Sequence, residues 1–242
     1  MADQEKVTSD ATSNVLSTMT NTFSSVISSW RSFVYDALIL KMTTRWYEAV
    51  LTKLPENSIV LDVGIGTAGA LLRCSKLLKE KNIHVVGVDY DADYIASAKQ
   101  AIEAAGMQSL IEVECKSVYD LKLGEKDKPY DAVYFSGSFS LLPDRIQALR
   151  TVSSTIVEGK IFITQTYQRK SPPMLSYLKP LLKYLTTIDF GQLLFEKDIA
   201  EFFSHTVPHE CDLKLVEHDV IPHSLDTPLQ AAYLTILEHK TN

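Results

Sequence analysis

The segment Val60–Ala70 constrains the fold of this 242-residue chain more than any other, because an apolar run leads directly into a glycine-rich loop, VLDVGIGTAGA. Glycine is needed where a backbone turns tightly and approaches a ligand closely. Gly64, Gly66 and Gly69 also satisfy the GxGxxG pattern of dinucleotide-binding loops, which has low specificity by itself. The segment therefore predicts a strand, a ligand-binding loop and a helix in succession.

Asp62, two residues before the first glycine, distinguishes between the cofactors that such a loop can bind. In a nicotinamide-dependent oxidoreductase this position is normally apolar, because a carboxylate there would repel the pyrophosphate. S-adenosylmethionine has no phosphate and carries a sulfonium and an ammonium, so the same carboxylate attracts it. Asp62 therefore favours S-adenosylmethionine. The alternative is a carboxylate that caps the following helix.

A second acid, Asp89, ends the apolar run His84–Asp89, about one βαβ repeat downstream. A carboxylate at this place can accept hydrogen bonds from both hydroxyls of a ribose. Enzymes that use NAD do the same, so Asp89 indicates a ribose without distinguishing the cofactor. Tyr90 follows and is a candidate to pack on an adenine. The alternative is an ordinary surface turn.

Short apolar runs alternate with helical patterns after Pro55. The expected strands are Ser58–Val63, His84–Val88, Ile111–Cys115, Ala132–Ser136 and Lys160–Gln165, the last one after a turn at Glu158 and Gly159. The expected helices are Leu71–Glu80, Ala92–Ala105 and Arg145–Ser154. Such alternation predicts right-handed βαβ units and a doubly wound α/β fold with a mostly parallel sheet. Two further strands, Leu213–Ile221 and Ala231–His239, are expected to pair as an antiparallel hairpin.

Two segments lie outside this alternation. Residues 1–55 are interpreted as a polar tail followed by a helical cap of two helices, since apolar residues recur at helical spacing from Phe23 to Leu54. Residues 56–242 form the main domain, into which residues 167–205 are inserted as an interrupted helical segment. The cap is either structural or an active-site lid.

The motifs together carry a family resemblance. The segments VLDVGIGTAGA, HVVGVDYDADYIASA, YDAVYFSGSFSLLP and IVEGKIFIT, within residues 56–166, resemble class I S-adenosylmethionine-dependent methyltransferases. The resemblance implies a Rossmann-like seven-stranded sheet with a reversed final hairpin. Tyr35 with Asp36, and Thr44 to Trp46, resemble more faintly the opening helices of ubiquinone-type and phospholipid-type members.

The resemblance also implies a set of cofactor-binding residues. Asp62, Gly64 and Gly66 would line the methionine and ribose part, and Asp89 would hold the ribose hydroxyls. Where the family often has an acid that binds the adenine amino group, this chain has Ser117, and the third glycine position of the loop is Ala68. The full expected set is Arg45, Asp62, Gly64, Gly66, Thr67, Asp89, Tyr90, Ser117, Val118 and Ser136.

Methyl transfer from a sulfonium requires no nucleophilic residue, metal or covalent intermediate. An alcohol or protonated amine as acceptor needs a general base, whereas a thiolate or neutral amine needs none. The candidate bases or orienting groups are Tyr35, Tyr167, His205, His209 and His223, of which the two tyrosines are taken as the catalytic candidates. Tyr35 is alternatively a core residue. His205 and His209 are not expected to bind a metal, because Pro208 should break the helix between them.

Aromatic residues concentrate in the cap and in the insertion, and include Phe33, Trp46, Tyr177, Tyr184 and Phe190. Core packing explains most of them. If some face a pocket, they favour a small, partly apolar acceptor enclosed by these two segments. The alternatives are a lipid headgroup, a protein substrate, a nicotinamide-dependent oxidoreductase, or a catalytically silent binding module.

Composition narrows the partners further. The formal net charge of −6 disfavours nucleic acid as a substrate, because such enzymes usually have a basic face. The three cysteines have no metal-ligand spacing. No apolar stretch approaches the length of a membrane span, and the first residues do not resemble a secretory signal. We therefore expect a cytoplasmic protein; membrane association is the alternative, and the oligomeric state is open.

Overall fold

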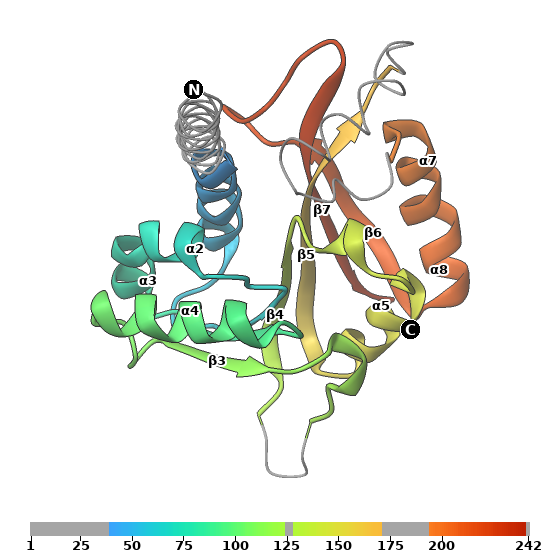
Figure 1. Cartoon of the computed structure of the whole chain (residues 1–242). Helices are drawn as coiled ribbons and strands as arrows, with labels where there is room; N and C mark the ends of the chain where they lie inside the picture. The colour runs from blue at the N-terminus through green and yellow to red at the C-terminus, as the bar shows by residue number, and fades with distance from the viewer. Residues whose placement is uncertain (1–38, 124–127, 171–193, 241–242) are drawn as a thin grey trace, which may run out of the picture.

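The computed structural model describes residues 39–123, 128–170 and 194–240, and these contain a seven-stranded sheet with the order β3-β2-β1-β4-β5-β7-β6 (Figure 1). The strands are β1 (Ile59–Val63), β2 (His84–Asp89), β3 (Ile111–Cys115), β4 (Tyr130–Ser136), β5 (Ile156–Gln168), β6 (Leu213–Val220) and β7 (Gln230–His239). Strands β1 to β5 pair in parallel, and β7 pairs antiparallel with both β5 and β6. The expected fold class and final hairpin are confirmed.

The strand order reverses between β1 and β4, which are neighbours in the sheet. The connection after β1 leads to one side, toward β2 and β3, whereas the chain after β4 continues to the other side, toward β5. In open α/β sheets a crevice forms outside the carboxyl ends of the strands at such a switch point, and ligands bind there. The glycine loop follows β1 and therefore lies at this crevice.

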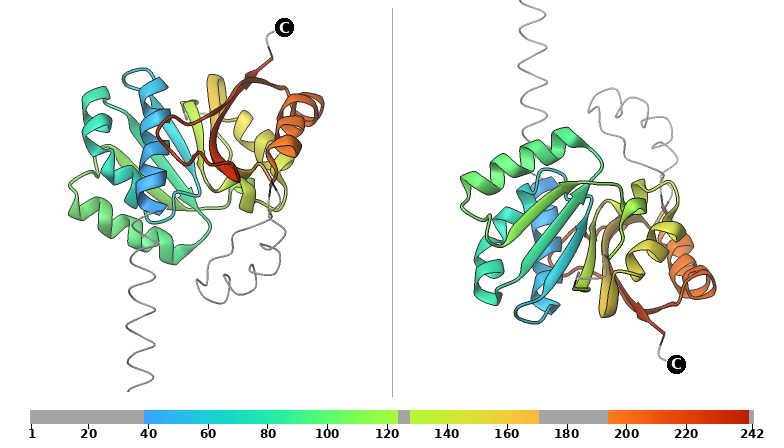
Figure 2. Two further views of the ribbon diagram at one scale, coloured as in Figure 1. Left: turned by 90° about the horizontal axis from the view of Figure 1, so that it is seen from above. Right: turned by 90° about the horizontal axis from the view of Figure 1, so that it is seen from below.

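Helices cover both faces of the sheet (Figures 1 and 2). One face carries a helix described over residues 39–53, together with α2 (Gly69–Arg73), α3 (Ser75–Lys81) and α4 (Ala92–Ala104). The other carries α5 (Arg145–Ser153), α7 (Glu196–Glu201), α8 (Val207–Glu210) and the short elements η1 (Val118–Asp120), η2 (Phe139–Leu141) and η3 (Phe202–Thr206). Each face has its own buried apolar cluster, as expected for strands with helices on both sides.

Strand β5 corrects one expectation. Glu158 and Gly159 do not form a turn but belong to β5, which begins at Ile156. A β-carbon at Gly159 would lie 2.7 Å from the carbonyl oxygen of Asp131, so only glycine lets β5 run this close to β4. The pairing register shifts at the same place, between Tyr130 and Ala132. Gly159 therefore marks a close backbone approach inside a strand rather than a chain reversal.

Two helices also differ from expectation. The helix expected over Leu71–Glu80 is divided at Cys74, whose N–H donates to the carbonyl of Leu71 in a tighter turn. Conversely, the helix from α7 to α8 continues through Pro208, so the expected break was wrong. The five residues of η3 form a π-helical segment just before this proline. The wider turn accommodates the missing N–H and the ring that an ordinary helix would exclude.

The terminal and inserted segments are only partly described. Tyr35 and most of the expected cap lie outside the described residues, as does most of the insertion. Of the insertion, Tyr167 and Gln168 belong to β5, and residues 196–205 lie in a helix that continues to residue 210. The indole N–H of Trp46 donates to the hydroxyl of Ser224 at 3.1 Å, which attaches the helix of residues 39–53 to the loop after β6.

In the part of the chain that the structure describes, no helix is long and apolar enough to cross a membrane.

Candidate active site

The loop after β1 has the left-handed backbone that its glycines permit. Gly64 has φ +78° and Gly66 has φ +58°. Ala68, which occupies the third glycine position of the loop, also has a positive φ of 58° and lies directly before α2. The N–H of Gly64 donates to the carbonyl of Val88 at 2.8 Å. The loop is therefore held against the end of β2.

Asp89 connects this loop to the end of β2. Its carboxylate accepts the N–H of Gly66 and the N–H of Asp91, each at 3.0 Å, and the residue is almost fully buried. Tyr90, by contrast, is 83% exposed to solvent. An aromatic ring so placed beside a buried carboxylate is available to cover a flat ligand.

The end of β3 lies next to Asp89, because the N–H of Lys116 donates to the Asp89 carbonyl at 2.8 Å. Ser117 follows and accepts the N–H of Tyr119 at 3.3 Å, so that its hydroxyl caps η1. Val118 is buried in the apolar cluster of the α5 face. Ser117 therefore keeps its own hydroxyl proton and one lone pair for a ligand.

Asp62 is a buried carboxyl group, only 1% exposed. Its Oδ2 accepts the hydroxyl of Tyr47 at 2.6 Å, whereas Oδ1 has no hydrogen-bond partner among the described residues. Burial raises the pKa of Asp62 to about 7; the hydrogen bond from Tyr47 lowers this pKa, and the charge of Asp89 raises it. A buried acid with one unsatisfied oxygen is suited to a cationic ligand group.

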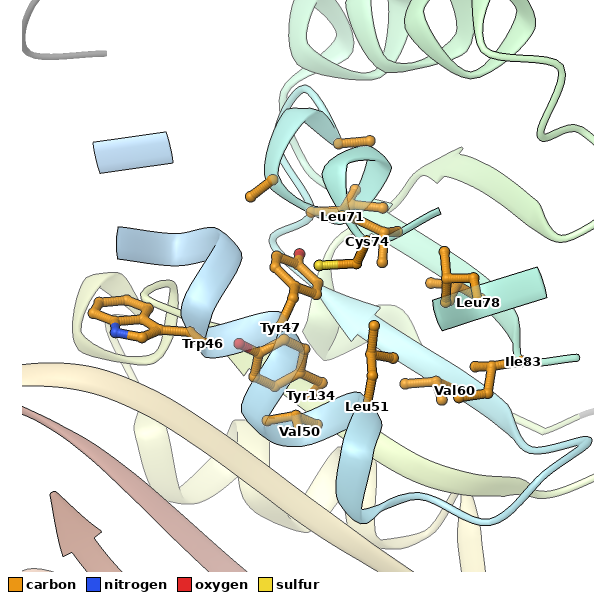
Figure 3. Close-up of a cluster of buried hydrophobic side chains, with 14 of the residues drawn as sticks. Trp46, Tyr47, Val50, Leu51, Val60, Leu71, Cys74, Leu78, Ile83 and Tyr134 are labelled. Atoms are coloured by element: carbon orange, nitrogen blue, oxygen red, sulfur yellow. The ribbon is translucent and has the colours of Figure 1, made fainter. Parts of the chain in front are cut away.

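Tyr47 comes from the helix of residues 39–53 and packs with its ring edge against Tyr134 of β4, at 5.0 Å between ring centroids. The Tyr134 hydroxyl shares a 2.8 Å hydrogen bond with that of Thr164 on β5. Both tyrosines belong to the buried cluster drawn in Figure 3. The two hydroxyls thus have different partners, and only that of Tyr47 is bonded to Asp62.

A cavity of about 150 Å³ lies between this helix and the glycine loop. Its lining residues come from the helix, the loop, the start of α2 and the end of β4: Leu40, Thr43, Tyr47, Gly64, Ile65, Thr67, Gly69, Ala70 and Ser136. The Ser136 hydroxyl is buried and, among the described residues, unpartnered. The cavity therefore joins backbone, hydroxyl groups and a neighbouring carboxylate at the switch point of the sheet.

The comparisons with known proteins agree with this arrangement. Residues 60–159 match the family described as "Methyltransferase domain", from the start of the glycine-loop segment to Gly159. Residues 60–159 therefore carry a methyltransferase domain, in agreement with the resemblance of the sequence to class I S-adenosylmethionine-dependent methyltransferases. A search of curated proteins found no significant match.

Solved structures share the fold of this methyltransferase. The MccD protein is 16% identical with a TM-score of 0.60, over 81% of this chain and 96% of that chain. The [4+2]-cyclase SpnF is 11% identical with a TM-score of 0.60, over 82% of both chains. A methyltransferase from Thiobacillus denitrificans in complex with S-adenosyl-L-homocysteine is 13% identical with a TM-score of 0.57, over 81% and 91%. At these identities the likeness establishes the fold alone.

The residues at the crevice fit S-adenosylmethionine, the cofactor that the sequence predicts. The free oxygen of Asp62 suits its cationic methionine end. The carboxylate of Asp89 suits its ribose hydroxyls. A β-carbon at Gly66 would meet nothing within 4 Å, so the loop leaves open space beside Asp89. In the described residues, no group of His, Cys, Asp or Glu side chains could hold a metal ion.

Several predicted site residues lie elsewhere in the methyltransferase. Arg45 is two residues from Thr43 and Tyr47, so it lies on roughly the opposite side of the helix, paired with Glu48 at 3.1 Å. Tyr167 is fully buried on the α5 face, opposite Tyr134, and burial raises its pKa. The exposed residues His205, His209 and His223 do not line the cavity. The structure therefore brings neither Arg45 nor Tyr167 to this cavity.

Sequence reasoning missed Thr43 and Tyr47, which line the cavity instead. The spacing of Leu40, Thr43 and Tyr47 places them on one helical face, which was a usable signal. The apolar pattern drew attention to Trp46 and Val50 as core residues. The hydroxyl of a buried tyrosine needs a polar partner, and this requirement could have marked Tyr47.

Proposed function

We propose that this methyltransferase transfers a methyl group to a small, partly apolar acceptor by direct in-line displacement. The observation that carries the proposal is the small cavity of about 150 Å³, whose wall is built partly from a helix N-terminal to the sheet. A folded protein or a nucleic acid would need an open surface at the reacting atoms. A recess of this size beside the glycine loop suits a compact molecule.

The bound cofactor supplies an activated methyl group on a sulfonium. The residues of the chain therefore need to bind, orient and exclude water, and correct positioning of two reactants is worth about 7–11 kcal/mol. Asp62 and Asp89 anchor the two ends of the cofactor. Leu40 and Ile65 supply apolar surface, and Thr43 and Ser136 supply hydroxyl groups toward the acceptor side.

The cavity also restricts the acceptor atom. Tyr47 is the only ionisable residue among the described residues that line it. Burial and the charge of Asp62 raise the pKa of Tyr47 well above its ordinary value, and its hydroxyl is already bonded to Asp62. Tyr47 is therefore a poor general base. An acceptor that reacts without one, a thiolate or a neutral amine, suits this cavity best.

A methyl-transfer screen tests the proposal. Purified protein is incubated with labelled cofactor and with small thiols, amines, phenols and carboxylates, and the Asp62→Ala variant serves as the control. We expect transfer to thiols or amines in the wild type and loss of transfer in the variant. Exclusive transfer to a protein or to lipid vesicles would overturn the small-acceptor proposal, and tight NADH binding without S-adenosylhomocysteine binding would contradict the cofactor.

Removal of residues 1–45 tests whether the N-terminal segment is a lid. The deletion takes away Leu40 and Thr43, two residues of the cavity wall. We expect turnover or acceptor selection to be lost. Full activity and unchanged selectivity in the truncated protein would contradict the lid.

A further inference from the structure

The hydrogen bond between Tyr47 and Asp62 joins two elements that approach only in the folded protein. Tyr47 belongs to the helix of residues 39–53, and Asp62 to β1. Both residues are buried, with 4% and 1% of their surface exposed. The bond occupies Oδ2 and leaves Oδ1 without a partner among the described residues. The tyrosine therefore determines which carboxylate oxygen remains for a ligand.

The ionisable groups around Asp62 come from several elements. They are Tyr47 on the helix, Tyr134 on β4, Asp89 on β2, and Cys74 between α2 and α3, which acts on Tyr134. None of these four carries a positive charge. The Tyr47 hydroxyl is thus the interaction that favours the ionised form of Asp62, against burial and the charge of Asp89.

We propose that Tyr47 is a positioning residue for the cofactor: it holds Asp62 ionised and oriented, so that Oδ1 is available to the cationic methionine end. The inference rests on cofactor binding and not on the identity of the acceptor. It makes the helix of residues 39–53 part of the cofactor site as well as of the cavity wall.

The proposal has a measurable pH signature. A carboxylate attracts a cation only after it has lost its proton, so the affinity for the cofactor should rise as the pH passes through the pKa of Asp62, about 7 in the free protein. The bond from Tyr47 lowers this pKa. Its removal should therefore move the rise in affinity to higher pH, a change that a simple packing role would not produce.

Tyr47→Phe and Tyr134→Phe form a matched pair of variants. Each removes one buried hydroxyl from the same cluster, but the Tyr134 hydroxyl is bonded to Thr164 instead of Asp62. Calorimetric titrations with S-adenosylmethionine, S-adenosylhomocysteine and adenosine, between pH 6 and pH 8.5, measure the effect. Adenosine has no methionine part and reports the rest of the site.

For Tyr47→Phe we expect about tenfold weaker binding of S-adenosylmethionine and S-adenosylhomocysteine at pH 7, since a hydrogen bond to a charged group is lost. The loss should diminish toward pH 8.5, and adenosine should bind as it does to the wild type. Tyr134→Phe should keep the wild-type pH dependence. An equal loss of adenosine binding, the same pH shift in Tyr134→Phe, or unchanged affinity in Tyr47→Phe would overturn the inference.

Asp62→Asn provides a second test that does not depend on the folding of Tyr47→Phe. In this variant the rise in affinity near pH 7 should disappear, and its persistence would overturn the inference. If the wild type binds neither S-adenosylmethionine nor S-adenosylhomocysteine, the proposed function fails together with the inference. Normal binding that is indifferent to Tyr47 overturns the inference alone.

Discussion

Gly64 lies so close to Ser138 that a β-carbon at residue 64 would stand 2.5 Å from the β-carbon of Ser138. The two residues follow the ends of β1 and β4, the neighbouring strands at which the strand order reverses. This contact packs the ends of the two strands against each other at the switch point of the sheet. A side chain at residue 64 is therefore disfavoured for two reasons, the clash with Ser138 and the positive φ.

Gly64→Ala should destabilise the protein more than Gly66→Ala does. Both glycines have a positive φ, which costs a non-glycine residue about 1–2 kcal/mol. Only at Gly64 does the added methyl group meet another residue, so we expect a total loss of about 2–4 kcal/mol there and about 1 kcal/mol at Gly66. Urea unfolding without cofactor measures both. Equal losses would contradict the steric role of Ser138.

Asp62→Asn should make the protein more stable above pH 7 in the absence of cofactor. The carboxyl of the unfolded chain ionises near its ordinary pKa of 3.8, whereas in the folded protein it keeps its proton up to about pH 7. The folded state therefore binds an extra proton between these values, and stability decreases as the pH rises through this window. Asparagine has no charge to bury, so the gain at pH 8 should be about 1–3 kcal/mol.

Urea unfolding of the wild type and Asp62→Asn at pH 4, 6 and 8 checks this expectation. The two proteins should differ least at pH 4, where the carboxyl is protonated in the folded protein and about half ionised in the unfolded chain. The difference should grow up to pH 7 and then remain constant. A constant difference at all three values would show that ionisation of Asp62 has no part in it.

Asp89→Ala should weaken S-adenosylhomocysteine binding about tenfold to hundredfold, because hydrogen bonds to a charged group are lost. The N–H of Gly66 would also lose its acceptor. Asp91→Ala is the matched control, since Asp91 caps α4 through the N–H groups of Asp93 and Tyr94. It should cost about 1 kcal/mol of stability and leave affinity unchanged. Similar affinity losses in both variants would exclude a direct role of Asp89.

Tyr167→Phe tests whether this tyrosine is a catalytic base. Its hydroxyl is buried without a hydrogen-bond partner among the described residues, so its removal should raise stability by about 1 kcal/mol and leave turnover intact. Thermal unfolding and steady-state kinetics measure the two effects. A large fall in kcat at unchanged stability and KM would instead identify Tyr167 as the base.

The local patterns of the sequence were sufficient to locate the strands of the sheet and to place two acids, Asp62 and Asp89, at one of its edges. Strands β1 to β4 were located to within a few residues, because their apolar runs are bounded by loops with characteristic residues. Asp62 and Asp89 follow from their places at the ends of β1 and β2. In a parallel sheet the carboxyl ends of strands share one edge, so positions along the chain become neighbours in space.

Other features required the tertiary structure. Gly159 was interpreted as a turn, because a sequence does not show that Asp131 lies against it. Pro208 was interpreted as a helix break, because the π-helical turn before it depends on packing.

The contact of Tyr47 with Asp62 belongs to the same class. The amino-acid sequence by itself determined which faces of the helices and strands are apolar, where the chain turns at the glycine loop, and which cofactor chemistry that loop favours. Only the tertiary structure decided that Tyr47, and not Arg45, faces the loop. The reason is physical: periodicity specifies that a face is buried, whereas the partner of a buried polar group depends on contacts between distant elements.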